Sequence, residues 1–329
     1  MAHLVAAFAS SHSVMLTCEL KDWQRHFREF DPKGSYYDDN GEVCSYQDLL
    51  ARAPANAADL VTDAAMAARF ETVHAAMARL RRDIADAQLD ALIICGDDQA
   101  ELFRDILMPS IGIYHGMTIR NGVRQDLPPE QWYKRAQMKR LEDKVERHYP
   151  VDAALAKYLI SGLVEHNFDI AALKGLAEGE HEGHAFSFIH KMYLQERTVP
   201  IVPIFLNTFF PPNQPTPARC LALGGALRAL IDAYPLDLRI GVMASGGLSH
   251  FRAEEGLDHQ VIDAIRHKDL SFLAALDPKR LQAGSSEIRN WIVLAAATRG
   301  FDLDWISYTP AYRTEALTGT GLAFASWKR

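Results

Sequence analysis

The sequence has few cysteines, and their spacing excludes two kinds of small fold. No two of them form a C-x-x-C pair. A disulfide scaffold or a zinc ribbon needs closer and more regular spacing. Scattered cysteines are typical of proteins from a reducing compartment, so we expect a cytoplasmic protein. The four positions are Cys18, Cys44, Cys95 and Cys220.

Long hydrophobic runs and a concentrated basic surface are also missing. No apolar run approaches the roughly 18 to 20 residues of a membrane-spanning helix, and the apolar N-terminus lacks the basic start of a signal peptide. The formal net charge is −7, and the one basic cluster, at Arg79, Arg81 and Arg82, is best interpreted as a solvated helix face. We therefore expect neither a membrane nor a nucleic-acid partner.

Buried strands alternate with helices along the chain. Apolar runs bounded by Gly, Pro or Asp predict strands at 3–9, 91–96, 111–116, 199–206 and 239–247. Periodic patterns predict helices at 63–88, 150–166, 218–233 and 258–274. This alternation predicts an α/β fold, a single domain over residues 1–329 whose central, mostly parallel sheet is flanked by helices. Two excursions interrupt the pattern, an irregular segment at 21–56 and a charged, helical one at 120–149.

Polar groups follow three of the predicted strands. The first strand leads into S-S-H-S around His12, the second into G-D-D-Q-A-E with Gln99 and Glu101, and the last into S-G-G-L-S-H, ending at His250. Sites in open α/β sheets assemble at the carboxyl ends of strands. Two histidines and a carboxylate on one face, with other positions open, are what a mononuclear non-haem metal site requires. A single histidine at a strand end is more often structural.

Two further motifs leave their interpretation open. His181 and His184, in GEHEGHAFSFIH, are three residues apart and would share one helix face, which alone is a weak metal signal. Glu287 precedes the apolar stretch IRNWIVLAAA. It is either a site carboxylate or a first-turn acid that complements the helix dipole.

Taken together, the motifs resemble the class III extradiol ring-cleavage dioxygenases, the superfamily of the protocatechuate 4,5-dioxygenase β subunit and the dihydroxyphenylpropionate dioxygenases. AFASSHSVML is similar to the family's first strand ending in S-H, SGGLSHF to its G-G-[LM]-S-H loop, and GSSEIRNWIVLAA to its S-x-E-[IL]-x-x-W helix. HAFSF resembles the D-H-G-F-A loop, and VPIVPIFLNTFFPPNQPTPARCLALGGAL resembles a strand, Pro-rich loop and helix of the family. The matches follow family order over residues 7–296.

The resemblance implies an Fe(II) enzyme that cleaves a catechol ring and inserts both atoms of O2. It implies that His12 and Glu287 bind the metal and that His184 and His250 act as acid and base. The substrate would be a small catecholic aromatic compound. We also expect a homo-oligomer, with or without a separate small subunit. The sequence shows no fused small helical subunit of the kind that some members of the family carry.

The chain departs from the family pattern at the remaining metal ligand. The position of the family's second ligand histidine falls on Gln99, and an amide oxygen is a weaker ligand for Fe(II) than imidazole. Gln99 is our predicted third ligand, with Glu101 or His181 as alternatives. The alternative function is a metal-binding, non-enzymatic relative of signalling type. A zinc-dependent hydrolase fits less well, because the chain has neither an H-E-x-x-H motif nor a cysteine pair.

Overall fold

The computed structural model describes residues 2–103, 107–122, 132–195 and 197–329. The strands are β1 (His3–Ser10), β2 (Ser35–Tyr37), β3 (Val43–Ser45), β4 (Ala91–Asp97), β5 (Ile111–Tyr114), β6 (Thr118–Asn121), β7 (Arg147–Pro150), β8 (Ala171–Leu173), β9 (Ile201–Leu206), β10 (Arg239–Ser245), β11 (His250–Arg252), β12 (Asp302–Tyr312) and β13 (Thr318–Lys328). The helices are α1 (Phe27–Phe30), α2 (Tyr46–Ala51), α3 (Ala57–Leu60), α4 (Asp63–Asp86), α5 (Trp132–Leu141), α6 (Ala153–Glu165), α7 (His184–Ile189), α8 (Pro217–Ala233), α9 (Glu255–His267), α10 (Leu270–Ala274) and α11 (Ile288–Ala297).

The main sheet has nine strands in the part of the chain that the structure describes. Their order is β11-β13-β1-β10-β4-β9-β5-β8, with β12 paired to β13. The central strands β1, β10, β4 and β9 are parallel neighbours, and antiparallel pairs flank them on both sides. The predicted α/β fold with a mostly parallel central sheet is therefore confirmed.

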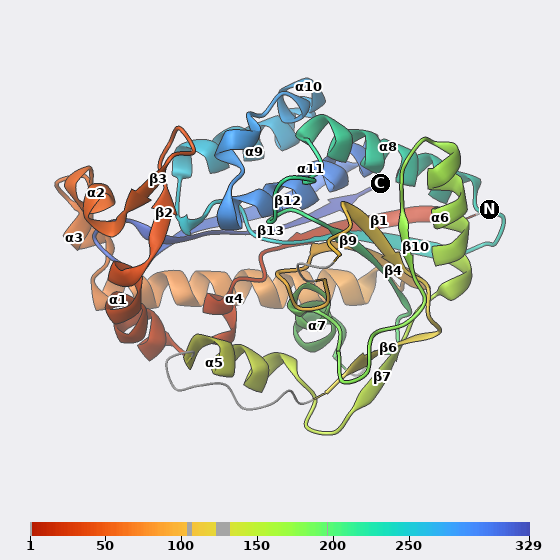
Figure 1. The fold of residues 1–329 in the computed structure, drawn as a ribbon, viewed down its shortest axis with the longest axis horizontal. Coiled ribbons are helices and arrows are strands. Elements are labelled where there is room, and N and C mark those ends of the chain that lie inside the picture. Colours follow the sequence, from red (N-terminus) through yellow and green to blue (C-terminus); the bar gives the residue numbers. More distant parts are fainter. Residues whose placement is uncertain (1, 104–106, 123–131, 196) are drawn as a thin grey trace.

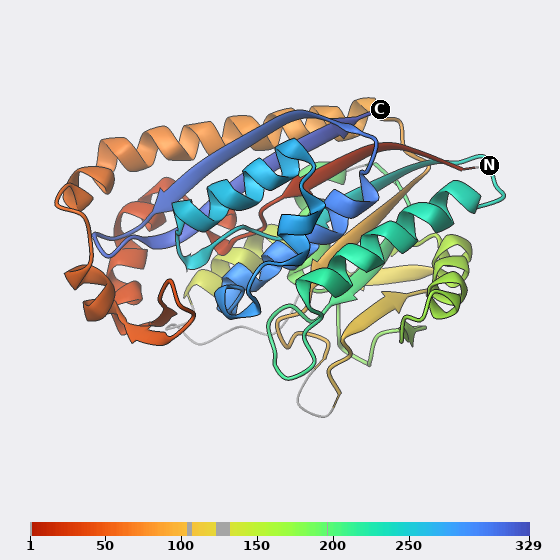
Figure 2. The same cartoon turned by 90° about the horizontal axis from the view of Figure 1, so that it is seen from above.

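Strand β4 shows why helices must cover both faces of this sheet. Every residue of β4 is buried. Leu92 and Ile94 pack into the hydrophobic layer on one face, and Ile93 and Cys95 into the layer on the other, as the two-residue period of a strand requires. Helices α6, α8, α9 and α11 contribute to one layer, and α4 and α7 to the other. Figures 1 and 2 show these helices on opposite sides of the sheet.

The structure differs from the prediction in two parts of the C-terminal half of the chain. The single helix expected at 258–274 is two helices, α9 and α10, because Lys268 ends α9 in the left-handed conformation at φ 57°. The long β12–β13 hairpin was not predicted. Its inner strand, TGTGLAFASWK, is buried except for Lys328, so its small and hydroxyl residues give neither alternation nor a continuous apolar run.

Both predicted excursions contain ordered elements. Residues 21–56 form short 3₁₀ or π turns, helices α1 and α2, and the β2–β3 hairpin. The charged segment at 120–149 contains α5, while its residues 123–131 lie outside the described part of the chain. None of the described helices combines the length and the apolar character needed to cross a bilayer.

Helix α11, which begins directly after Glu287, packs closely against α8. A Cβ atom added at Gly224 of α8 would lie 2.0 Å from the carbonyl oxygen of Val293 and 2.8 Å from the Cβ of Ala296. The neighbouring Gly225 has no atom within 4 Å of the same position. The glycine at 224 therefore sets how closely the two helices approach.

We predict opposite effects of alanine at these adjacent glycines. Gly224→Ala should lower the free energy of unfolding by about 1–3 kcal/mol, because α8 and α11 must move apart. Gly225→Ala should raise it by up to about 1 kcal/mol, because alanine is the better helix former. Urea unfolding of both variants measures the difference. Equal effects of the two substitutions would contradict this account of the α8–α11 contact.

Candidate metal centre

Four buried ionisable side chains meet at the carboxyl edge of the sheet. His12 follows β1, Asp97 is the last residue of β4, and Glu287 directly precedes α11. His184 is the first residue of α7. The ends of the strands are level, since Ser10 of β1 pairs with Ser245 of β10. This edge, at the carboxyl ends of the parallel strands, is where the sequence predicts a site.

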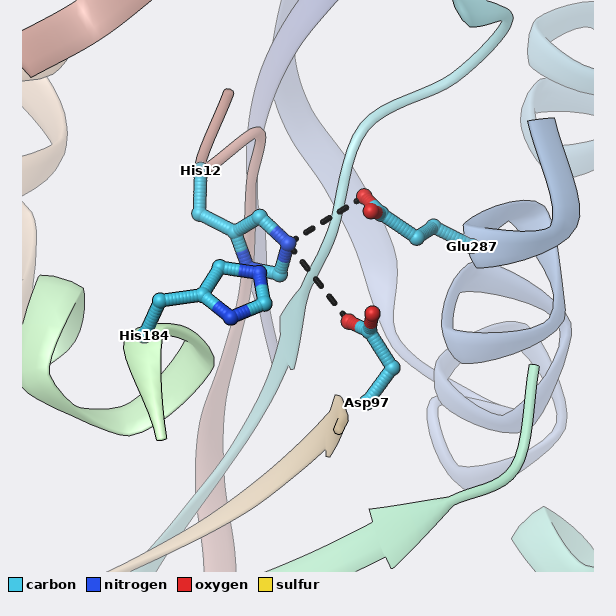
Figure 3. Close-up of side chains that lie close together, drawn as sticks. All are labelled: His12, Asp97, His184 and Glu287. Atoms are coloured by element: carbon cyan, nitrogen blue, oxygen red, sulfur yellow. Dashed lines mark ion pairs between the residues drawn. The ribbon is translucent and has the colours of Figure 1, made fainter. Parts of the chain in front are cut away.

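The four side chains point toward a common centre (Figure 3). One ligand atom from each of His12, Asp97, His184 and Glu287 lies within 4.8 Å of the others. His12 Nε2 is 3.3 Å from Glu287 Oε2 and 3.5 Å from Asp97 Oδ1. The rings of His12 and His184 meet edge to face, with 4.5 Å between their centroids. Imidazole nitrogens and carboxylate oxygens together suit a divalent transition metal.

Hydrogen bonds determine which nitrogen of His12 carries the proton. Ser245 Oγ donates its proton to the carbonyl oxygen of Ala185, at 2.7 Å. It must therefore accept from Nδ1 of His12, which is 2.9 Å away. Neutral His12 then has its lone pair on Nε2, the atom that faces the two carboxylates. The serine has the usual role of a residue that orients a metal-ligating histidine.

Two atoms at the centre have no hydrogen-bond partner among the described residues. They are His12 Nε2 and Asp97 Oδ1, both fully buried. A lone pair there would be repelled by the carboxylate oxygens unless a positive charge lies between them, either a proton on Nε2 or a metal ion. A bound metal would satisfy both atoms at once, so the residues present fit a metal ion.

The carboxyl groups differ in their electrostatic surroundings. Burial alone would raise the pKa of Glu287, but His250 and His12 hold it well below its ordinary value. Burial and the nearby Glu287 raise the pKa of Asp97. Two carboxylates this close favour one proton between them unless a positive charge is added. A divalent cation supplies that charge.

Gln99, the predicted third ligand, lies beside both carboxylates. Its Nε2 is 3.2 Å from Asp97 Oδ2 and 3.1 Å from Glu287 Oε1. In this orientation the amide donates to two possible ligands instead of presenting its oxygen. Direct ligation by Gln99 stays a prediction, and Asp97 is a candidate that the sequence analysis did not select.

Glu101 and His181, the two alternatives for the third ligand, lie elsewhere. Glu101 Oε2 accepts from His184 Nδ1 at 2.7 Å and from the His184 backbone at 2.9 Å, so it orients His184 and leaves Nε2 facing the centre. His181 Nε2 is 3.8 Å from Glu146. Burial opposes the charging of His184, but Glu101, Asp97 and Glu287 outweigh it and raise its pKa to about 10.

His250 lies beside Glu287, outside the group of four. Its Nδ1 donates to the carbonyl oxygen of Leu248 at 2.8 Å, and its Nε2 is 3.1 Å from Glu287 Oε1. Burial disfavours its charged form, yet Glu287 and the Leu248 carbonyl raise its pKa. A Cβ atom at Gly284 would lie 1.9 Å from the His250 ring. The small residue before Glu287 thus leaves room for this histidine.

A buried carboxylate fixes the loop that carries His250. Asp258 accepts from the backbone and the hydroxyl of Ser249, at 2.8 and 2.7 Å, and from the Tyr308 hydroxyl at 2.7 Å. Burial raises the pKa of Asp258 to about 6. This carboxylate links α9, the loop and the β12–β13 hairpin.

A cavity of about 390 Å3 opens beside the four side chains. This volume is within the usual range for small-molecule sites. Its walls are aromatic on one side, with Phe27, Phe30, Tyr36 and Tyr133, and it reaches His12, His184, His250 and Glu287. Within the irregular segment 21–56, Tyr36 lines the cavity and Trp23 lies in the core.

Sequence comparisons point to one family. Residues 70–323 match the model of the catalytic LigB subunit of aromatic ring-opening dioxygenase. The chain is 34% identical over 100 residues to the 2,3-dihydroxyphenylpropionate/2,3-dihydroxicinnamic acid 1,2-dioxygenase of Comamonas testosteroni, which covers 30% of each chain. It is 33% identical over 101 residues to the gallate dioxygenase of Pseudomonas putida, covering 30% of this chain and 28% of the relative. Each alignment thus spans less than a third of the relative's length.

We predict that a divalent metal stabilises the protein through this centre. At a hundredfold excess over the dissociation constant, binding adds about 2.7 kcal/mol to the free energy of unfolding. Thermal unfolding under anaerobic conditions, with and without Fe(II) or Mn(II), measures this gain. Glu287→Gln should abolish it, because the variant removes one negative ligand. Glu178→Gln, at an exposed position, and His181→Ala should retain it; loss of the gain in His181→Ala would place the metal elsewhere.

Proposed function

Because the chain belongs to the family of the catalytic LigB subunit of aromatic ring-opening dioxygenases, we propose that it is an Fe(II)-dependent extradiol dioxygenase. It would cleave a catechol-type ring beside the two hydroxyl groups and insert both atoms of O2. The observation that carries this proposal is the position of His12 Nε2, which faces two buried carboxylates at the edge of a small-molecule cavity.

The proposed ligands are His12 and Glu287, with Asp97 or Gln99 in the third position. Asp97 is favoured by its orphaned oxygen, which lies 3.5 Å from His12 Nε2. Gln99 would then hold the two carboxylates in place through its amide nitrogen. A mixed nitrogen and carboxylate set that leaves other positions open is typical of non-haem Fe(II) sites.

The bound metal would supply Lewis acidity and a common binding place for catechol and O2. The chain's own residues would handle the protons. His184 donates from Nδ1 to Glu101. The surrounding carboxylates favour its charged ring, whereas a divalent cation at the centre would favour the neutral ring, whose Nε2 can accept the proton of a catechol hydroxyl. His250 donates from Nδ1 to a backbone carbonyl, and its Nε2, 3.1 Å from Glu287 Oε1, would carry the proton that is returned during ring opening.

Aromatic side chains would orient the ring and exclude water. Phe27, Phe30 and Tyr133 line the cavity on the side contributed by α1 and α5. Flat apolar walls suit an aromatic ring, which stacks offset or edge-on against them. The catechol hydroxyls would then face the metal centre, where the polar groups converge.

We also propose a cytoplasmic location and a homo-oligomeric assembly. The location is supported by the free thiols of all four cysteines, each of which is buried, as is usual in a reducing compartment. The alternative function, a metal-binding relative without ring-cleavage activity, is favoured by the glutamine at position 99. Two histidines placed for proton transfer favour the enzyme.

We predict that His250→Ala binds metal but turns over slowly. Loss of a general acid or base should lower kcat by roughly two to four orders of magnitude, measured as oxygen uptake with a panel of catechols. His267→Ala, at an exposed position on α9, is the control and should keep full activity. Oxygen uptake at the control rate by a metal-loaded His250→Ala variant would rule out its proposed role.

A second comparison identifies the third ligand. The loss of a residue that hydrogen-bonds to a metal ligand typically weakens metal binding by roughly one to two orders of magnitude. If Asp97 is the ligand, Asp97→Asn should weaken Fe(II) binding by more than this, and Gln99→Ala should weaken it by no more than this. Anaerobic Fe(II) titration of both variants gives the two affinities. The reverse order would assign the third position to the Gln99 oxygen.

A further inference from the structure

Arg313 brings a buried cation to the cavity from a distant part of the chain. It lies in the turn between β12 and β13 and is only 4% exposed. The same cavity is lined by His12, His184 and Glu287 of the metal centre. Figure 2 shows this end of the hairpin beside the early segment that contains α1. No local pattern in the sequence marks this arginine as a functional residue.

Two contacts hold the Arg313 side chain in place. Its Nε donates to Asp31 Oδ2 at 2.8 Å, and the same oxygen accepts from the Thr318 hydroxyl at 2.6 Å. Its guanidinium lies over the ring of Phe27, with 4.4 Å between its carbon and the ring centroid. Both salt-bridge partners are nearly inaccessible to solvent. The guanidinium is therefore oriented before any ligand arrives.

The outer edge of this guanidinium is left without an acceptor. Within the described residues, Nε is the one atom of the Arg313 side chain that donates to another side chain. Nη1 and Nη2 have no such partner there, and they are not fully enclosed by protein atoms. The terminal nitrogens therefore reach the cavity that Arg313 lines. Paired N–H groups in a planar fork match the two oxygens of a carboxylate.

The charges around the cavity allow an anion to bind at this end. Asp31 and Glu287 are the acidic residues of its wall, while Arg313 and Lys134 are its lysine and arginine residues. The Asp31 carboxylate is engaged by Arg313 and Thr318 on one oxygen, and Glu287 belongs to the metal centre. Lys134, which is exposed, adds a second positive charge to the same wall.

We propose that Arg313 binds a carboxylate on the side chain of the substrate. The substrate class is then a catechol that carries an acidic substituent, with its hydroxyls at the metal centre and its carboxylate at the hairpin turn. The assignment of the ring rests on the proposed function. The anion site rests only on Arg313 and its surroundings.

Binding of unreactive aromatic acids tests the anion site without any turnover. Benzoate, phenylacetate and 3-phenylpropionate differ in the spacing between ring and carboxylate, and the three corresponding amides are neutral controls. Calorimetric titration of the Fe(II)-loaded protein, without oxygen, should show that at least one acid binds more tightly than its amide. Arg313→Gln should weaken binding of that acid roughly 10- to 100-fold and leave the amide unchanged.

Two further variants keep the test decisive if Arg313→Gln fails to fold. Loss of the arginine leaves the Asp31 carboxylate buried without its partner, which lowers the free energy of unfolding. The double variant Asp31→Asn/Arg313→Gln therefore removes both charges together. It should show the same selective loss of acid binding. Arg266→Gln changes an exposed arginine and should bind the acid normally. Equal weakening of acid and amide, or acid binding that is unchanged without Arg313, would overturn the proposal.

Oxygen uptake separates this proposal from the proposed function. With 3-(2,3-dihydroxyphenyl)propionate, 3,4-dihydroxybenzoate and their amides, the wild type should favour an acid, and the double variant should lose that preference in kcat/KM. Arg313-dependent acid binding without oxygen uptake on any catechol would leave the anion site standing and defeat the enzyme. Ring cleavage whose kcat/KM depends neither on the substrate carboxylate nor on Arg313 would support the enzyme and overturn the anion site.

Discussion

The cost of burying two carboxylates beside each other governs the structure of this site. Asp97 and Glu287 are 0% and 1% exposed, and Nε2 of His12 faces a carboxylate oxygen of each. Burial of such charges is expensive unless each finds a partner. Hydrogen bonds from Gln99, His250 and the Gly247 backbone meet part of the demand. His12 Nε2 and Asp97 Oδ1, which have no hydrogen-bond partner among the described residues, face one another. A cation bound by both atoms would satisfy them.

The fold supplies this arrangement from parts of the chain that are far apart. Strands β1 and β4 end at the same edge of the sheet, and Glu287 directly precedes α11, which packs closely against α8. A serine at the end of β10 orients His12, and Glu101 orients His184. Each functional side chain is thus held by a second polar residue, so its geometry is fixed before a substrate binds.

The sequence indicated the central strands and the chemistry of the edge, because both depend on local patterns. Continuous apolar runs predicted β1, β4 and β10, and the polar residues after them included His12 and Gln99. The pairing of Asp31 with Arg313, which are 282 positions apart, depends on tertiary contacts that no local pattern records. Asp97 was missed for a different reason. It is the first polar residue after a buried strand, a signal that was present but was outweighed by the family position at Gln99.

We propose above all that His12, Asp97, His184 and Glu287 surround a metal ion. Anomalous diffraction on both sides of the iron absorption edge tests it directly, using crystals of protein loaded with Fe(II) under anaerobic conditions. We expect one strong iron peak within bonding distance of His12 Nε2 and a Glu287 carboxylate oxygen. An iron peak at another place, or none in crystals of protein that binds iron in solution, would contradict it.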